Sequence, residues 1–228
     1  MDVQTILTNL KEISDPSRLE HMSKFGIITT DALGISIPKL RAIAKDIPKN
    51  HELALALWNT GIHEARILAC YIDEITAVTP AQLEEWVLDF NSWDLCDQCC
   101  SNHVDKTPYA HQKAIEWSHR SEEFVKRAGF VLMATLSVHD KTATDTDFDC
   151  FFDRIIAECN DNRVYVKKAV NWALRQIGKR NKKLHKKAVE IGLEILRKDT
   201  KTARWIARDA LRELRSEKIQ RRLDRISK

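Results

Sequence analysis

Apolar residues recur along most of this chain at intervals of three and four, which is the spacing of one face of an α-helix. The pattern is clear in L-R-A-I-A-K (40–45), L-A-L-A-L-W (53–58) and A-V-N-W-A-L-R-Q-I (169–177). Sustained alternation of apolar and polar residues, which is typical of half-buried strands, is absent from the sequence, and glycine occurs only six times. The pattern therefore predicts an all-α fold.

The predicted helices come in similar pairs, in which a first helix that often ends near a tryptophan leads through a short turn into a second helix. Three such pairs are 53–58 with 63–72, 83–90 with 93–100, and 113–120 with 124–133. Short motifs also return: A-L-R-Q-I at 173–177 reappears as A-L-R-E-L at offset 37, and V-K-R-A at 125–128 reappears as V-K-K-A at offset 41. Two helices per period of about 40 residues are typical of HEAT-like repeats, whose second helices line a concave face of a solenoid. We expect residues 1–228 to form one HEAT-like repeat domain; an irregular α-helical bundle is the alternative.

Two Thr-Pro pairs indicate where helices begin. Thr79 precedes Pro80, and Gln82 follows at the position that completes a capping box. Thr107 and Pro108 form a similar signal. We therefore expect helices to begin at both places.

The composition favours a soluble globular protein, with 43% hydrophobic and 31% charged residues. No apolar run approaches the roughly 20 residues that a membrane span needs, and the sequence M-D-V-Q-T-I-L-T shows no signal peptide. The six cysteines do not have the spacing of a disulfide framework, so we expect a reduced, cytoplasmic setting.

Charge is distributed unevenly along the chain. Residues 1–162 carry 15 Lys/Arg against 26 Asp/Glu, a net charge of −11, whereas residues 163–228 carry 22 against 7, a net charge of +15. Residues 163–189 contain ten Lys/Arg and no acid. A cationic segment within a folded domain indicates a polyanionic partner, most commonly nucleic acid. A solvated helical surface is the alternative.

A helix over residues 165–179 would separate apolar residues from a mixed stripe. The stripe consists of Lys168, Trp172, Arg175 and Lys179, spaced by four, three and four residues. Cations can bind a nucleic-acid backbone, and an exposed ring between them offers a flat stacking surface. Alternatively, Trp172 packs against a neighbouring repeat and the cations extend around it.

The segment S-W-D-L-C-D-Q-C-C (92–100) places Trp93 and Asp97 one helical turn apart. A metal site is not favoured, because Cys96 and Cys99 form a single C-x-x-C and His103 is the only other nearby candidate. We expect buried, reduced thiols instead. A fixed carboxylate could stabilise the oxocarbenium-like state of glycosidic cleavage or orient the attacking water. Equally, Asp97 could cap a helix or form a salt bridge.

At these residues the sequence resembles the AlkD-like family of DNA alkylation-repair glycosylases, which are built from HEAT-like repeats. The resemblance extends from about His21 to the C-terminus. It is carried by the order and spacing of four motifs: G-I-S-I-P-K-L-R-A-I-A-K (34–45), S-W-D-L-C-D (92–97), F-V-K-R-A (124–128) and Y-V-K-K-A-V-N-W-A-L-R (165–175).

The resemblance implies excision of cationic N3- and N7-alkylated purines from duplex DNA by a monomeric enzyme, without a deep base-flipping pocket, a cofactor or a metal. By position, the residues implied around the damaged nucleotide are Trp93, Asp97, Trp172 and Arg127, with Asp97, Trp93 and Trp172 as the catalytic set. Lys168, Arg175 and Lys179, together with Arg127, are expected to bind DNA phosphates.

Two features depart from the family pattern, and two functional alternatives follow. Phe25 stands where some active members have a tyrosine, and the acidic segment 145–161 is longer than usual. The first alternative is a DNA-binding protein of the same family that does not excise bases. The second is a HEAT-type scaffold for protein interactions, which should show no affinity for DNA at low salt.

Overall fold

The computed structural model describes residues 2–226, and these form helices joined by short turns, with no strand among them. This confirms the predicted all-α class. The helices fall into two compact units, one ending at Pro108 and the other beginning at Tyr109. The expectation of a single domain over residues 1–228 stays a prediction. None of the described helices is long and apolar enough to cross a membrane.

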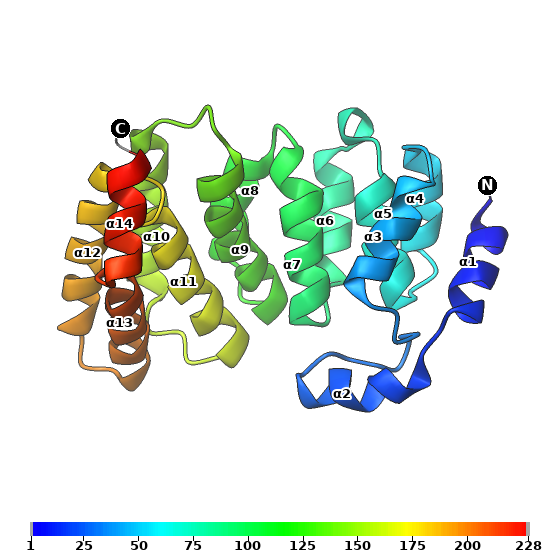
Figure 1. The fold of residues 1–228 in the computed structure, drawn as a ribbon, viewed down its shortest axis with the longest axis horizontal. Coiled ribbons are helices and arrows are strands. Elements are labelled where there is room, and N and C mark those ends of the chain that lie inside the picture. Colours follow the sequence, from blue (N-terminus) through cyan, green and yellow to red (C-terminus); the bar gives the residue numbers. More distant parts are fainter. Residues whose placement is uncertain (1, 227–228) are drawn as a thin grey trace. The chain divides into compact units, whose positions relative to one another are not determined.

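The first unit contains the helices coloured blue to green in Figure 1. They are α1 (Val3–Glu12), α2 (Leu19–Lys24), α3 (Ile37–Lys45), α4 (His51–Trp58), α5 (His63–Ile72), α6 (Pro80–Leu88) and α7 (Trp93–Asn102), with 3₁₀ turns η1 (Pro16–Arg18), η2 (Ile75–Ala77) and η3 (Val104–Lys106). The predicted pairs correspond to α4 with α5 and α6 with α7. Helices α3, α5 and α7 pack side by side as one layer.

Tryptophans at the ends of first helices join neighbouring repeats of this unit. The rings of Trp58 on α4 and Trp86 on α6 stack in parallel, with centroids 4.0 Å apart and an angle of 2° between the planes. Both side chains are buried. Offset-stacked aromatic pairs add to the free energy of burial. The recurring tryptophan therefore reflects packing between repeats.

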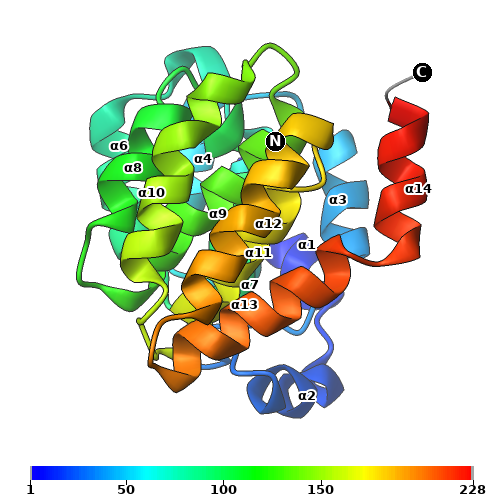
Figure 2. The ribbon, with the colours of Figure 1, turned by 90° about the vertical axis from the view of Figure 1, so that its left-hand side faces the viewer.

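The second unit contains the remaining helices (Figure 2). They are α8 (Ala110–Ser118), α9 (Glu123–His139), α10 (Asp149–Glu158), α11 (Val164–Ile177), α12 (Lys182–Leu196), α13 (Lys201–Leu214) and α14 (Glu217–Ile226), with η4 (Asp145–Phe148). First helices α8, α10 and α12 contact one another in sequence, and so do second helices α9, α11 and α13. The helices of the α8–α9 pair approach closely because residue 129 is glycine: a Cβ there would lie 2.5 Å from the Ser118 nitrogen.

The repeat is longer in the second unit than in the first. Helices α9, α11 and α13 begin at Glu123, Val164 and Lys201, which reproduces the offsets of 41 and 37 seen in the sequence. In the first unit α5 begins at His63 and α7 at Trp93, so the repeat is 30 residues there. The predicted period of about 40 residues is therefore correct only for the second unit.

One predicted helix start is confirmed and the other is displaced. The Thr79 side chain accepts a hydrogen bond from the Gln82 nitrogen (3.2 Å) at the start of α6, but the Gln82 side chain donates to Asp73 (2.7 Å) and does not complete a capping box. Helix α8 begins at Ala110, not after Thr107. The Thr107 hydroxyl instead donates to the Val104 carbonyl (2.8 Å) at the end of η3.

Candidate functional site

Helix α7 begins at Trp93, with Ser92 as its extended N-cap residue. The Trp93 side chain is half-buried, and its indole N–H donates a hydrogen bond to the Phe25 carbonyl oxygen (2.9 Å). Phe25 ends α2 and leaves 59% of its surface exposed. The residue that departs from the family pattern thus orients Trp93 through its backbone, which any residue at position 25 could do, while its exposed ring makes no contribution to this bond.

Asp97 lies one turn after Trp93 and is also half-buried. Cys100, one turn further along the same face of α7, is fully buried. The face therefore emerges from the core at Asp97 and Trp93, so the first unit presents a ring and a carboxylate together. A carboxylate in such partly desolvated surroundings interacts more strongly with a nearby cation than one in bulk water does.

A polar network adjoins Asp97 on the next residue of α7. The Gln98 side-chain oxygen accepts hydrogen bonds from the Tyr71 hydroxyl (2.6 Å) and from Arg41 (3.3 Å). Arg41 also donates to the Tyr71 oxygen (3.4 Å), and it is exposed on α3. This network joins α3, α5 and α7 and places a cation within the first unit. Sequence reasoning missed it, although Arg41 lies within the first family motif.

Asp94, three residues before Asp97, has a different environment. It is buried, and its carboxylate bonds the Nε2 atom of buried His63 (2.9 Å) at the start of α5. Burial alone would raise the pKa of Asp94, but the hydrogen bond and charge of His63 outweigh it and lower the pKa below 3.8. Burial would likewise lower the pKa of His63, but its bond to Asp94 raises the pKa above 6.5. Asp94 therefore joins α7 to α5.

Asp73 is the centre of a second buried cluster that the sequence did not reveal. Its carboxylate accepts hydrogen bonds from His51 (2.8 Å), His103 (2.7 Å) and Gln82 (2.7 Å). Burial would raise the pKa of Asp73, but these three hydrogen bonds outweigh it and lower the pKa. His103, considered above as a metal ligand, thus binds a carboxylate and packs against the ring of Trp86.

The cysteines of α7 are buried free thiols, as expected. Cys96, Cys99 and Cys100 are inaccessible to solvent. Burial raises the pKa of Cys99 and of Cys100 well above 9, which favours the neutral thiol over the reactive thiolate. Within residues 2–226 no group of three or more His, Cys, Asp or Glu side chains is arranged to hold a metal ion.

In the second unit, α11 has the two faces that the sequence predicts. The apolar face is fully buried and consists of Val166, Ala169, Val170, Ala173, Leu174 and Ile177. On the opposite side Lys168 is exposed and Trp172 is half-buried. Lys168 forms no ion pair with any residue from 2 to 226, so its ammonium group is available to an external anion.

The other two members of the stripe are engaged by α13. Glu213 accepts a hydrogen bond from Lys179 (2.7 Å) and another from Arg175, and the Arg175 Nε atom lies 3.9 Å from Asp209. Burial would raise the pKa of Glu213, but Lys179 and Arg175 outweigh it and lower the pKa. For either cation to bind phosphate, it must exchange this carboxylate for the phosphate.

Arg127 on α9 is buried, with 6% of its surface exposed. Its guanidinium donates a hydrogen bond to the Tyr165 carbonyl oxygen (2.8 Å) in the first turn of α11. Arg127 therefore fixes the start of α11 relative to α9, in addition to any contact with DNA.

The acid-free segment 163–189 is largely neutralised by acids from outside it. Six of its ten cations form ion pairs: Arg163 with Asp161, Arg175 and Lys179 with Glu213, Lys182 with Asp224, Lys183 with Asp145, and Lys187 with Asp149. The long acidic segment 145–161 supplies three of these partners. The segment is therefore less cationic in the folded protein than its own sequence indicates, because acids from other parts of the second unit pair with it.

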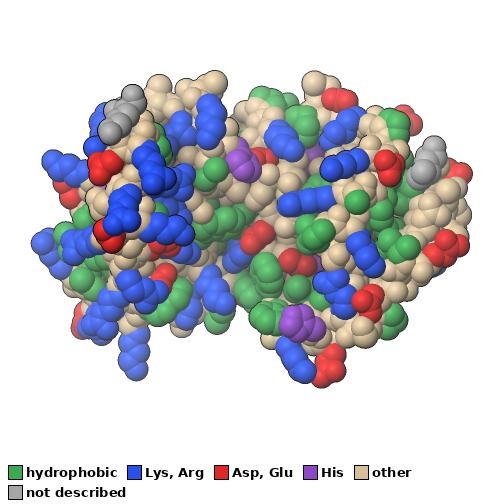
Figure 3. Space-filling model, in the orientation of Figure 1, with side chains coloured by type: hydrophobic (Ala, Val, Ile, Leu, Met, Phe, Trp, Pro, Cys, Tyr) green, Lys and Arg blue, Asp and Glu red, His purple; other side chains and the backbone are tan. Residues whose placement is uncertain are grey.

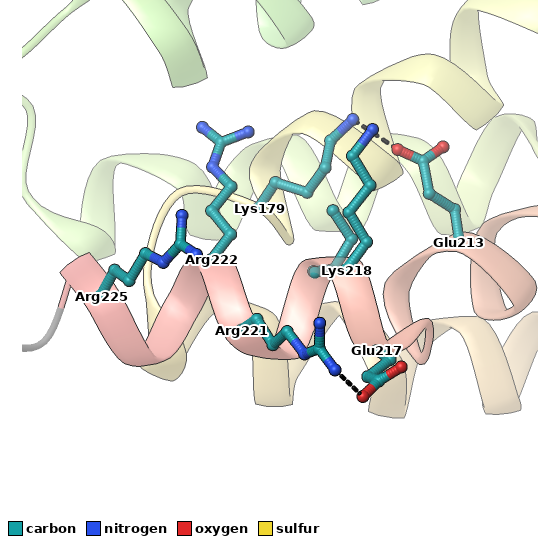
Figure 4. A pocket seen from close by; sticks show the side chains of 8 residues that line it. Lys179, Glu213, Glu217, Lys218, Arg221, Arg222 and Arg225 are labelled. Carbon is teal, nitrogen blue, oxygen red and sulfur yellow. Dashed lines mark hydrogen bonds and ion pairs between the residues drawn. The ribbon is translucent and has the colours of Figure 1, made fainter.

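Further cations lie on α14, beyond the predicted stripe. Lys and Arg side chains crowd the surface over α12, α13 and α14 (Figure 3). A pocket of about 610 Å³ separates α14 from Lys179 and Glu213 (Figure 4). Its basic lining consists of Lys179, Lys218, Arg221, Arg222 and Arg225. The signal for this site in the sequence was the basic C-terminal segment E-K-I-Q-R-R-L-D-R-I.

The predicted site residues are thus divided between the units. Trp93 and Asp97 share one face of the first unit. Arg127, Lys168, Trp172, Arg175 and Lys179 belong to the second unit. The expectation that all of them surround one nucleotide stays a prediction.

Comparisons with known proteins agree with this architecture. The family model described as DNA alkylation repair enzyme matches residues 6–214. A solved structure described as a new family of proteins related to the HEAT-like repeat DNA glycosylases, with affinity for branched DNA structures, is 23% identical to this chain; the match covers 99% of this chain and 95% of that one, with a TM-score of 0.78. This similarity confirms the HEAT-like repeat fold. No curated protein matches the chain.

Proposed function

Because the chain belongs to the DNA alkylation repair enzyme family, we propose that it hydrolyses the N-glycosidic bond of cationic N3- or N7-alkylated purines in duplex DNA. The observation that carries this proposal is the position of Asp97, a half-buried carboxylate one turn from the half-buried ring of Trp93. The other carboxylates of α5 and α7, Glu64 and Asp94, are buried and hold backbone N–H groups or a histidine.

A single carboxylate suffices for this substrate. An alkylated purine already carries a positive charge, so it leaves with the electron pair of the glycosidic bond as a neutral base and needs no general acid. The bond breaks at C1′, and the sugar passes through an oxocarbenium-like state. Asp97 stabilises that cation or orients the water whose oxygen bonds to C1′, and the proton of the water passes to solvent.

The remaining residues hold the DNA. Trp93 and Trp172 contact the sugar and backbone at the lesion, and Lys168 binds a phosphate directly. Arg175 and Lys179 bind phosphate after exchanging Glu213 for it, and Arg127 supports the first turn of α11. No cofactor takes part in the proposed reaction.

A second candidate is DNA binding without excision. The protein of the similar solved structure has affinity for branched DNA, and the cations of α13 and α14 in this chain favour a polyanionic partner whether or not chemistry follows. Release of base from methylated duplex DNA separates the two candidates.

The decisive experiment is single-turnover release of N7-methylguanine from duplex DNA by Asp97→Asn. This variant keeps the shape of the side chain and removes its charge. We expect the rate to fall about 10²–10³-fold, the cost of losing one such electrostatic contact. DNA affinity should stay level or rise slightly, because a carboxylate that repels phosphate is lost.

Glu85→Gln is the matched control, since Glu85 is an exposed carboxylate on α6 of the same unit. It should release base at the rate of the unmodified protein. Full activity in Asp97→Asn would contradict the proposed role. No release by the unmodified protein, combined with DNA binding, would favour the second candidate.

A further inference from the structure

Trp205 differs from the other tryptophans in its exposure. Trp58, Trp86 and Trp117 are at most 3% exposed, and Trp93 and Trp172 are half-buried. Trp205 on α13 leaves 41% of its surface exposed. Helix α13 already has a buried apolar face, which consists of Ala203, Ile206, Ala207, Ala210, Leu211 and Leu214. Packing of the core therefore does not account for this ring.

Cations surround the ring of Trp205. It lines an open pocket of about 310 Å³ together with Lys201, Arg204, Arg208, Asp209 and Arg212. The ammonium group of Lys167, on α11, lies 5.3 Å from the ring centroid. This cation–π contact holds the ring beside Lys167, and 41% of the surface of Trp205 still remains exposed.

The cations of this pocket are only weakly committed within the chain. Arg208 is exposed and forms no ion pair with any described residue. Arg204 pairs with Asp199 (3.2 Å), whose side chain is 98% exposed, and Arg212 pairs with Asp209 while remaining 80% exposed. Exposed ion pairs contribute little to stability, so a phosphate can replace the carboxylate at little cost.

We infer that Trp205 is a stacking platform for an unpaired nucleotide of DNA, and that the surrounding cations of α13 bind the phosphates beside that nucleotide. The inference rests on the DNA binding of the proposed function and not on base excision. The volume suits one nucleotide, because it lies at the lower end of the roughly 300–1,000 Å³ of ligand pockets.

The ring is what makes an unpaired nucleotide the expected occupant. Inside a duplex, both faces of each base are covered by neighbouring bases, so a protein ring cannot stack on them without unstacking the helix. Single strands, forks and branch points present uncovered base faces, and stacking on an aromatic side chain is tolerant of sequence. Cations alone would bind the backbone of any DNA equally. Trp205 therefore adds preference for DNA that contains unpaired bases.

The experiment compares two DNA molecules of the same sequence. One is a relaxed, covalently closed duplex minicircle, which has no ends, and the other is linear and carries an unpaired fork. The unmodified protein should prefer the fork. Trp205→Ala should weaken fork binding about 5- to 150-fold, the range expected for loss of one base–aromatic stack, and leave minicircle binding unchanged.

Two further variants separate stacking from folding. Trp205→Phe keeps a ring and should retain most of the preference for the fork, whereas Trp205→Leu keeps apolar bulk without a ring and should lose it. Leu88→Ala removes an exposed apolar side chain from the first unit and should change neither affinity. Arg208→Ala should weaken binding of both DNA molecules, because it removes a phosphate contact.

The outcomes distinguish this inference from the proposed function. Equal binding of fork and minicircle by the unmodified protein, or a preference that survives in Trp205→Leu, overturns the platform. If the cations around Trp205 bind an acidic protein and not DNA, substitution of Trp205 should leave the binding of both DNA molecules unchanged, and that result also overturns the platform. Release of N7-methylguanine from a methylated minicircle should occur at the same rate with the unmodified protein and with Trp205→Ala. If neither protein releases the base, the proposed excision is overturned, and preference for the fork is still tested independently.

Discussion

The two units of this protein use charged side chains in different ways. Residues 1–108 carry 9 Lys/Arg against 16 Asp/Glu, and residues 109–228 carry 28 against 17. In the first unit, acids such as Glu64, Asp73 and Asp94 are buried and accept hydrogen bonds from backbone nitrogens or histidines. In the second unit, acids such as Glu213 pair with Lys or Arg side chains in partly exposed positions.

Charged side chains in the two units therefore differ in how easily they can exchange one partner for another. A buried carboxylate has lost its hydration, so removing its partners leaves a large uncompensated cost. A partly exposed ion pair can be replaced by another ion pair because water and salt screen both states. The first unit therefore holds its buried carboxylates in fixed places, and the exchange of carboxylates for DNA phosphates that we propose concerns the partly exposed ion pairs of the second unit.

The largest expected effect tests this contrast through stability. Asp73→Ala leaves His51, His103 and Gln82 without their shared acceptor, so we expect the free energy of unfolding to fall by about 3–5 kcal/mol. Glu213→Ala removes the acceptor of Arg175, whose side chain is 27% exposed, and of Lys179, whose side chain is 11% exposed beside an open pocket, so its cost should be smaller, about 1 kcal/mol. Urea unfolding of both variants measures the two values.

Equal losses in Asp73→Ala and Glu213→Ala would erase the distinction between the units. The control is a melting curve with a single transition in each variant. If the two units unfold in separate transitions, the free energy of unfolding must be fitted for each unit.

The sequence predicted the helices of both units because local periodicity determines which face of a helix is apolar. The buried face of α11 and the exposure of Lys168 follow directly from spacing. The acid partners did not follow, because Glu213 lies 38 residues after Arg175 and reaches it only when α13 packs on α11. Packing between repeats, not local pattern, creates that pair.

One signal could have found the polar pairs of the first unit. His63 and Asp94 are 31 residues apart, as are Trp58 and Asp89, whose carboxylate accepts the indole N–H (2.8 Å). These separations equal about one repeat of the first unit, so partners occupy equivalent places in neighbouring repeats. Identical residues recur in the sequence at a period of about 40, whereas these complementary residues recur at a period near 30.

The second prediction concerns pH and the His63–Asp94 pair. Because the pKa of His63 is raised above 6.5, its contribution to stability is fully present below pH 6.5 and is lost as the pH rises through the raised value. Because the pKa of Asp94 is lowered below 3.8, its contribution is present above that pH and is lost as the pH falls through the lowered value. The pair therefore stabilises the protein most between about pH 4 and 6.5.

The difference in unfolding free energy between the unmodified protein and Asp94→Asn should be largest in this window and should shrink at higher pH, by about 1.4 kcal/mol for each unit by which the His63 pKa is raised. Glu213→Gln is the comparison from the second unit. The pKa of Glu213 is lowered from 4.5, so its contribution is lost only under acid conditions. A flat difference for Asp94→Asn between pH 5 and 8 would show that His63 does not charge in the folded protein.

The smallest expected effect concerns exchangeable charge on α11. Lys168 is exposed and forms no ion pair within the described chain, so Lys168→Ala should reduce the slope of log affinity against log salt by about 0.9, the value for one phosphate contact. Glu213→Gln should act in the opposite direction, because it releases Arg175 and Lys179 to bind phosphate. The slope should become steeper by up to about 1.8, and affinity at low salt should rise.

Lys186→Ala is the control and should leave the slope unchanged, because Lys186 is an exposed cation on α12, in the other helical layer. Duplex binding measured across a range of salt concentrations checks all three variants. If Lys168→Ala and Lys186→Ala reduce the slope equally, the total charge of the second unit attracts DNA and the stripe of α11 has no special role. If Glu213→Gln leaves the affinity for DNA unchanged, Arg175 and Lys179 serve only to join α11 to α13.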